Sequence, residues 1–178
     1  MSWLPALLSL QGCGGWEGLL EAAHQRYLED FFYTLPRFIG RAIKLRRTPV
    51  TNSKEAAFWH LIQEGESEDD RTPSMERCER IAWVRALIEA AEDATRVRLW
   101  SSMRQTGRGP KLHWVLALLD FSYLVVLRDD RDTVLLLTAY PVEKERRRLK
   151  LKREYDEWRA QTPNGPQDGP SKSQGPLP

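Results

Sequence analysis

Two apolar runs near the middle of the chain show the clearest pattern in the sequence. Residues 123–127 and 133–140 are rich in Val, Leu and Tyr, contain no charged side chain, and are joined by the charged segment 128–132. Runs of this composition on either side of a short polar connection are typical of a β-hairpin. We therefore predict a hairpin over 123–140, in the middle of a sheet.

Alternation along the second run predicts which side chains share a face, because successive side chains of a strand point to opposite sides. We expect the face that carries Leu135 and Leu137 to pack against the core. The opposite face then ends in the hydroxyls of Thr138 and Tyr140, just before Pro141 stops the ladder. Polar groups at the mouth of a sheet often belong to functional sites, so these two hydroxyls are candidates for chemistry.

Two more strands are predicted ahead of the hairpin. Residues 95–103 alternate Val and Leu with Arg and Trp, and residues 112–118 form an apolar run. A turn with two glycines, over 105–111, lies between them. Neighbouring strands are not separated by a helix, and a parallel pair needs a crossover connection of roughly a dozen residues or more. We therefore expect about four antiparallel strands in a meander.

Apolar residues recur at helical spacing before and after these strands. Helices are predicted over 16–33, 55–62 and 87–91, whereas 76–85 fits either a helical turn or the start of an extended segment. Residues 143–160 predict a strongly basic amphipathic helix. The expected fold class is α+β, with N-terminal helices packed on a roughly four-stranded antiparallel sheet that is closed by the basic C-terminal helix.

Length and composition limit the domain organisation. A chain of 178 residues with 41% hydrophobic content can form one sizeable core and is too short for two well-packed domains. We expect a single domain over 16–160, preceded by a flexible N-terminus over 1–15. Pro, Gly, Ser and Gln dominate 161–178, which predicts a disordered tail.

The N-terminus and the cysteines indicate a compartment. The first apolar run lacks the positive flank of a secretory signal, is broken by Pro5, and is shorter than the roughly 20 residues of a membrane span. Cys13 and Cys78 form no disulfide framework. We expect a cytoplasmic protein without membrane contact, and delivery into another cell without a cleavable signal stays open.

Charge is more clustered than the formal net charge of +2 suggests. An acidic run over 64–70 predicts an exposed loop. Basic segments lie at 44–47, 108–111 and 146–153, and such segments are either solvated surface or contacts to phosphate groups. On the second interpretation, the RNA-binding residues are Arg46, Arg47, Arg108, Lys111, Arg147 and Lys150.

The residue types argue against several kinds of site. Three scattered histidines and two isolated cysteines show no metal-ligand spacing, and the acidic run has no second carboxylate-bearing strand beside it. The Gly107-Arg108-Gly109 turn is too short for a phosphate-binding loop, and there is no nucleophile elbow. We expect no metal, no cofactor, and neither kinase nor serine-hydrolase chemistry.

The remaining polar residues fit RNA cleavage without a metal. This reaction needs a base for the 2′-hydroxyl, cations that stabilise the phosphorane and a proton donor for the 5′-oxygen. Each residue also has a structural interpretation, because a histidine beside aromatic residues is often a satisfied packing group and arginines flanked by glutamates often form ion pairs. The candidates are His60, Arg77, Arg80, Thr138 and Tyr140.

Three short segments carry a resemblance to known proteins. Phe58-Trp59-His60-Leu61, Arg77-Cys78-Glu79-Arg80-Ile81 and Leu137-Thr138-Ala139-Tyr140 are similar to segments of an uncharacterised bacterial family. The order of helices, hairpin and Arg-rich helix over 16–158 resembles the superfamily of barnase, EndoU, colicin-type tRNases and RelE. These proteins are metal-independent ribonucleases, and they are often toxins.

The resemblance implies roles for the candidates. His60 would be a catalytic base or acid, and Arg77 with Arg80 would bind the scissile phosphate. Thr138 and Tyr140 would hydrogen-bond the phosphate or donate the proton to the leaving group. Only RNA supplies the 2′-hydroxyl that this chemistry needs, so the substrate would be RNA.

Met75-Glu76 departs from the expected pattern, because a carboxylate beside a phosphate site opposes an anionic substrate. Either Glu76 points away from the phosphate site or the activity of this protein is weakened. We expect an endoribonuclease toxin of a toxin-antitoxin, phage or interbacterial conflict system, with a cognate antitoxin or immunity protein as partner. The alternatives are a non-enzymatic nucleic-acid-binding regulator and a structural or phage-related interaction protein.

Overall fold

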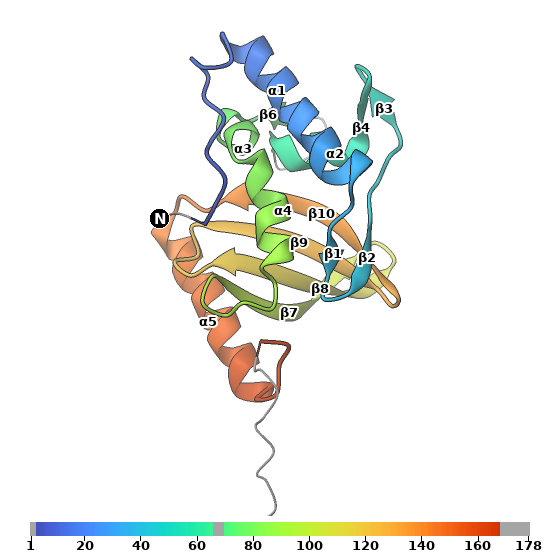
Figure 1. The fold of residues 1–178 in the computed structure, drawn as a ribbon. Helices are drawn as coiled ribbons and strands as arrows, with labels where there is room; N and C mark the ends of the chain where they lie inside the picture. The colour runs from blue at the N-terminus through green and yellow to red at the C-terminus, as the bar shows by residue number, and fades with distance from the viewer. Residues whose placement is uncertain (1–2, 66–69, 168–178) are drawn as a thin grey trace, which may run out of the picture.

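A computed structural model describes residues 3–65 and 70–167 of the chain (Figure 1). At its centre lies a six-stranded sheet with the strand order β1-β2-β10-β9-β8-β7. The last four strands in sequence form an antiparallel meander, so the predicted α+β class with a mostly antiparallel sheet is confirmed. Their bounds are Val97–Thr106 for β7, Gly109–Leu118 for β8, Tyr123–Asp130 for β9 and Thr133–Pro141 for β10.

Two short strands make the sheet wider than predicted. β1 (Arg37–Phe38) pairs antiparallel with β2 (Arg41–Lys44), and β2 pairs parallel with the start of β10. The expectation of an all-antiparallel sheet rested on strands that are neighbours in sequence. The chain between β2 and β10 includes most of the fold, which is more than long enough for a parallel crossover.

The N-terminal helices lie on one side of the sheet and share an apolar core with Leu99, Leu116 and Val125. The predicted helix over 16–33 is present and ends in a π-helical turn. The segment 76–85, for which two conformations were open, is helical. The bounds are Trp16–Leu28 for α1, Glu29–Tyr33 for η1, Ala56–Ile62 for α2, Met75–Glu79 for α3 and Ile81–Glu89 for α4.

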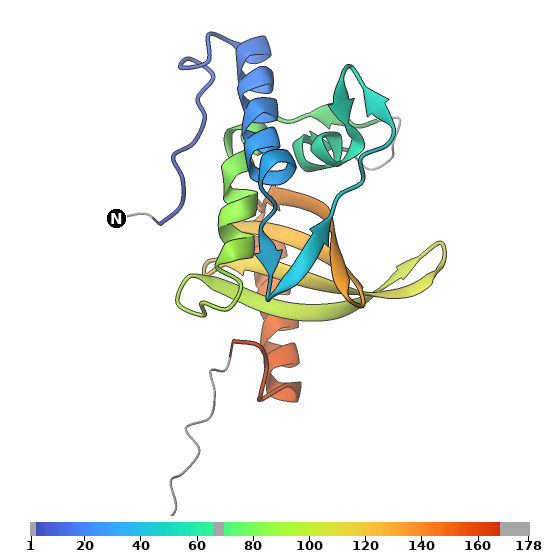
Figure 2. The same cartoon turned by 45° about the vertical axis from the view of Figure 1, so that its right-hand side comes forward.

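The helix α5 (Glu145–Gln161) covers the opposite face of the sheet. Its Leu151 and Tyr155 pack against Trp100 and Val115 in a second apolar cluster, separate from the one beneath α1 and α4. Figures 1 and 2 show α4 in front of the sheet and α5 behind it. The sheet is thus a middle layer with one apolar core on each side.

Two small hairpins flank α2. β3 (Val50–Thr51) and β4 (Lys54–Glu55) precede the helix, and β5 (Gln63–Glu64) pairs with β6 (Thr72–Pro73) after it. Within the acidic run 64–70, residues 66–69 lie outside the described part of the chain. The hairpins bring residues that precede and follow α2 in the chain close to the helix. The site described below contains residues from both segments.

A β-bulge interrupts the alternation of β10. The register between β9 and β10 shifts by one residue at Leu137. Because an extra residue reverses the faces that follow it, Val134 and Leu136 before the bulge and Ala139 after it all point into the first core and are buried. The prediction that Leu135 and Leu137 face the core is therefore wrong, and both are only partly buried.

Both ends of the domain contact its body. In the N-terminal segment, the Leu8 amide donates to the Glu79 carbonyl over 3.0 Å, and Trp83 Nε1 donates to the Pro5 carbonyl over 2.9 Å. After α5, the side-chain amide of Gln167 bonds to the backbone N–H of Leu99 and to backbone carbonyls at 91 and 97, along the outer edge of β7. The rest of the predicted tail, 168–178, lies outside the described residues.

No helix in the described part of the chain is both long enough and apolar enough to cross a lipid bilayer.

Candidate functional site

The short helix α2 turns two large side chains away from the core. Phe58, Leu61 and Ile62 recur at helical spacing and are buried beneath the helix. Trp59 and His60 therefore lie on its outer side, where both are half-buried. These two neighbours form the centre of the candidate site.

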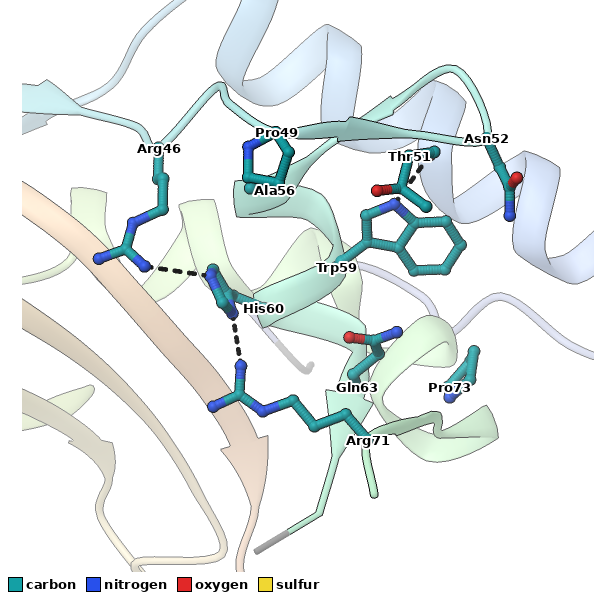
Figure 3. A pocket seen from close by; sticks show the side chains of 10 residues that line it. All are labelled: Arg46, Pro49, Thr51, Asn52, Ala56, Trp59, His60, Gln63, Arg71 and Pro73. Carbon is teal, nitrogen blue, oxygen red and sulfur yellow. Dashed lines mark hydrogen bonds between the residues drawn. The ribbon is translucent and has the colours of Figure 1, made fainter. Parts of the chain in front are cut away.

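His60 lies between two arginines, one from each side of α2 (Figure 3). Arg71 Nη1 lies 2.8 Å from His60 Nδ1, and Arg46 Nη1 lies 3.5 Å from His60 Nε2. Guanidinium groups only donate hydrogen bonds, so Nδ1 accepts from Arg71 and a neutral ring carries its proton on Nε2. The Nε2 proton then faces the Arg46 guanidinium at 3.5 Å, and two donors that meet in this way are stabilised by an acceptor that both can reach.

The three residues lie where two pockets meet. One pocket has a volume of about 470 Å³, within the range of roughly 300 to 1,000 Å³ that is usual for small-molecule sites. The other has about 250 Å³ and is closed by residues 135–138 of β10. Arg46, His60 and Arg71 line both, and no carboxylate is among the described lining residues of either. Two guanidinium groups at one junction are suited to an anion.

Thr138, Tyr140 and Arg77 lie next to this junction. Thr138 Oγ1 donates to the His60 carbonyl over 3.3 Å. The Arg77 guanidinium donates to the carbonyl of Gln63, just after α2, and its Cζ lies 5.2 Å from the centre of the Tyr140 ring. Thr138 therefore contacts His60 directly, and Arg77 contacts the end of α2. Tyr140 is linked to these residues only through Arg77: it is not among the described lining residues of either pocket and packs against the second apolar cluster.

Arg80, the fifth candidate, lies in a different environment. It donates to the Glu76 carbonyl over 3.0 Å, approaches the Glu79 carboxylate to 3.6 Å and stacks over the Trp83 ring at 5.5 Å. These contacts tie it to the junction of α3 and α4. Glu76 itself turns toward Glu143, and the hydrogen bond between the two carboxyl groups raises the pKa of Glu76.

No protein-family model matches this chain, and comparison with curated proteins and with solved structures finds no significant match. The relation to the barnase, EndoU, colicin tRNase and RelE superfamily therefore stays a prediction.

In the described part of the chain, no three side chains of His, Cys, Asp or Glu gather closely enough to hold a metal ion.

The residues predicted to bind RNA are spread over the molecule. Arg46 lines the site, whereas Arg47 pairs with Glu55 over 2.7 Å and stacks over Phe32 at 5.2 Å. Glu55 also accepts a 2.7 Å hydrogen bond from the buried Tyr27, and this hydrogen bond fixes the hairpin β3–β4 to α1. Arg108 and Lys111 lie at the tip of the β7–β8 hairpin, and Arg147 and Lys150 lie on α5.

Arg71 is the residue of the site that sequence reasoning missed. It follows the acidic run directly, and there it resembles an ordinary countercharge in an exposed loop. Its role depends on the return of β6 alongside β5, which places the arginine beside a histidine eleven residues earlier. A single basic residue at the end of an acidic loop, shortly after a histidine, is the only sequence signal that could have identified it.

Proposed function

We propose that this protein is a metal-independent endoribonuclease whose chemistry takes place at the junction of the two pockets. The observation that carries the proposal is the imidazole of His60 between the guanidinium groups of Arg46 and Arg71, at 3.5 and 2.8 Å. A base flanked by two permanent cations is suited to a phosphodiester. The base can deprotonate the attacking hydroxyl, and the cations can stabilise the negative charge of the transition state.

We assign the steps of the reaction to Arg46, His60 and Arg71 and, for the leaving group, to Tyr140 or water. When a phosphodiester binds, the two guanidinium groups turn to its non-bridging oxygens, and His60 Nδ1 loses its hydrogen bond from Arg71. That nitrogen then takes the proton of the 2′-hydroxyl as the 2′-oxygen forms a bond to phosphorus. The bond from phosphorus to the 5′-oxygen breaks, and the 5′-oxygen takes a proton from the Tyr140 hydroxyl or from water. The products are a 2′,3′-cyclic phosphate and a 5′-hydroxyl.

The arginines supply the electrostatic part of the catalysis. Negative charge grows on the phosphorane oxygens in the transition state, and fixed donors aimed at those oxygens stabilise it. Arg77 lies behind Tyr140 and orients its ring through the stacking contact. Thr138 fixes the end of α2 through the His60 carbonyl and so positions the imidazole.

Purified protein and single-stranded RNA in the presence of a chelator test the proposal. We expect His60→Ala to reduce cleavage about 10²- to 10⁴-fold and Arg46→Ala or Arg71→Ala to reduce it about 10²- to 10³-fold, because each removes a base or a charge-stabilising donor. Arg96→Ala is the matched control, since Arg96 is an exposed arginine paired with Asp93 at 3.0 Å. DNA of the same sequence should stay intact, and undiminished cleavage by the His60 variant would refute the assigned site.

We further propose, from the resemblance noted above, that the ribonuclease acts as a toxin and is neutralised by a partner protein. Induced expression in a bacterium should arrest growth. The arrest should disappear in both His60→Ala and Tyr140→Phe, with the protein still present at equal level. Arrest that persists in both variants would contradict the toxin mechanism.

A second candidate, nucleic-acid binding without cleavage, is favoured by one observation. The exposed cations Arg146, Lys150 and Arg153 form one stripe along α5, on the face of the sheet opposite the first core. Binding that weakens steeply with salt while the RNA stays uncut would support this candidate over the ribonuclease.

A further inference from the structure

The larger pocket extends beyond the groups that the reaction uses. Past the cationic end, its wall consists of Trp59 with Pro49 and Pro73, and the side-chain amides of Asn52 and Gln63 border it. In Figure 3, Trp59, Pro73 and the two amides lie on the side of His60 away from Arg46, and Pro49 lies between Arg46 and Trp59. One end of the pocket therefore suits an anion, and the other offers an aromatic and apolar wall with a few polar groups.

The indole of Trp59 is held in place before any ligand arrives. Its Nε1 donates to the Thr51 carbonyl over 3.0 Å, and its ring meets Phe58 edge-on at 5.6 Å between centres. A ring that is already ordered loses little conformational entropy when another ring stacks on it. Trp59 is thus a rigid platform rather than a surface residue that happens to be aromatic.

The two amides come from positions that the fold fixes. Asn52 and Ser53 form the turn of the β3–β4 hairpin with φ values of 49° and 60°, a left-handed conformation that Asn tolerates well. Gln63 starts β5, directly after α2. Each amide offers both a donor and an acceptor, which is what the edge of a nucleobase requires.

We propose that the larger pocket is a nucleotide subsite, which rests on the proposed function. A base stacks on Trp59 with its edge toward Asn52 and Gln63, while the attached phosphate lies between Arg46 and Arg71. A base stacked on a protein ring cannot stay in a duplex, so the substrate is RNA that is single-stranded at this nucleotide. Trp59 and the two amides then determine which nucleotides are cut.

Titration calorimetry with the full chain tests the subsite without any cleavage. The probes are inorganic phosphate, the four nucleoside 3′-monophosphates and the four 5′-monophosphates. The variants are Trp59→Ala, the conservative Trp59→Phe, and Trp16→Ala as a control, since Trp16 is an exposed tryptophan at the start of α1. Circular dichroism before each titration confirms that a variant is folded.

We expect Trp59→Ala to lower nucleotide affinity about 5- to 150-fold, the range set by base stacking on aromatic side chains, and to leave phosphate affinity unchanged. Trp59→Phe should retain most of the affinity, and Trp16→Ala all of it. Tighter binding of either the 3′ or the 5′ series supports the subsite and identifies which neighbour of the phosphate enters it. Asn52→Gly, which keeps the turn, should alter the ranking of the four bases.

Nucleotide affinity that is the same in Trp59→Ala and in the unaltered protein would overturn the subsite, as would an equal loss for phosphate and nucleotides. This outcome is distinct from failure of the ribonuclease. If RNA stays uncut but nucleotides bind in a Trp59-dependent way, the ribonuclease proposal fails and the subsite stands. If RNA is cut in a His60-dependent way with equal rate and base preference in Trp59→Ala, the subsite fails and the ribonuclease stands.

Discussion

Asp129 connects three strands through one carboxylate. Its Oδ2 accepts from Arg41 Nη1 over 2.7 Å and from Trp114 Nε1 over 2.9 Å, and its Oδ1 accepts from the Arg131 amide over 2.9 Å. Arg41 belongs to β2 and Trp114 to β8, on either side of the hairpin. The Arg41 hydrogen bond, assisted by the Trp114 and Arg131 donors and opposed by partial burial, lowers the pKa of Asp129 to about 2.

We predict that this carboxylate makes stability depend on pH in the acid range. A carboxyl whose folded pKa is lowered stabilises the protein above its unfolded pKa, and the contribution is lost as pH falls toward the folded value. Asp129→Asn should cost about 1 to 3 kcal/mol at neutral pH, because the Arg41 partner is lost. Urea unfolding of both proteins between pH 7 and pH 2 measures the effect.

The two stability curves should converge as pH approaches about 2, where the Asp129 carboxylate takes up its proton. Glu92→Gln is a control, since Glu92 is an exposed carboxylate just after α4. A difference between Asp129→Asn and the unaltered protein that stays constant over the whole pH range would contradict the assignment.

At this scale the sequence revealed residue types but not their partners. His60 and Thr138 were both proposed for the site, and the structure places the Thr138 hydroxyl 3.3 Å from the His60 carbonyl. That these residues meet, 78 positions apart, depends on how α2 lies against β10. The same dependence on tertiary contacts explains why Arg71 was missed and why Arg80 was placed in the site.

Among the elements, β10 decides how the site is built, because its bulge changes the face of everything after Leu137. Thr138 and Tyr140 share a side, while Ala139 fills the first core. In a regular strand the side chains at 134, 136, 138 and 140 would share one face, so both hydroxyls would point into the first core. The bulge is what allows a strand with a buried first half to end in polar side chains beside α2.

We predict opposite tolerances for two neighbouring leucines in β10. Leu136→Ala should destabilise the protein by about 2 to 5 kcal/mol, because Leu136 is 3% exposed in the first core and its loss leaves a cavity. Leu137→Ala should cost less than about 1 kcal/mol, because the bulged residue is only partly buried. Denaturant unfolding measures both, and a larger cost for Leu137→Ala than for Leu136→Ala would contradict this placement of the two leucines.

The sequence predicted the position of these strands but not the bulge. The hydrophobic runs locate β10 to within one residue and the start of β9, whereas β9 continues three residues past its apolar run to Asp130. The predicted helix over 16–33 matches α1 with η1. A run of leucines such as 135–137 is compatible with either face, since all of its side chains can be buried. The register is set by the pairing with β9, which a single strand does not reveal.

For the molecule as a whole, α2 and α5 lie on different sides of the sheet (Figure 2). An RNA strand in the pocket contacts Arg46 and Arg71 whether or not it also reaches α5. The chemistry and any binding by the basic helix can therefore be separated by substitution.

We predict that replacing Arg146, Lys150 and Arg153 by Gln weakens RNA binding without changing the rate of cleavage of bound RNA. If all three contact phosphates of a single strand, the slope of log affinity against log salt should fall by about 2, since each contact contributes roughly 0.7. Lys152→Gln is the control, because Lys152 is paired with Asp156 over 2.6 Å. An unchanged slope would show that RNA does not reach α5.

The hydrogen bonds of Gln167 have a consequence for the behaviour of the protein in concentrated solution. β7 is the last strand of the sheet, and its outward backbone groups are a template on which another chain can add a strand. The Gln167 amide occupies the Leu99 N–H and the carbonyl at 97, so a single side chain takes the place of a neighbouring strand. Gln167 thus blocks part of one sheet edge to strand addition, an effect that is independent of any catalysis.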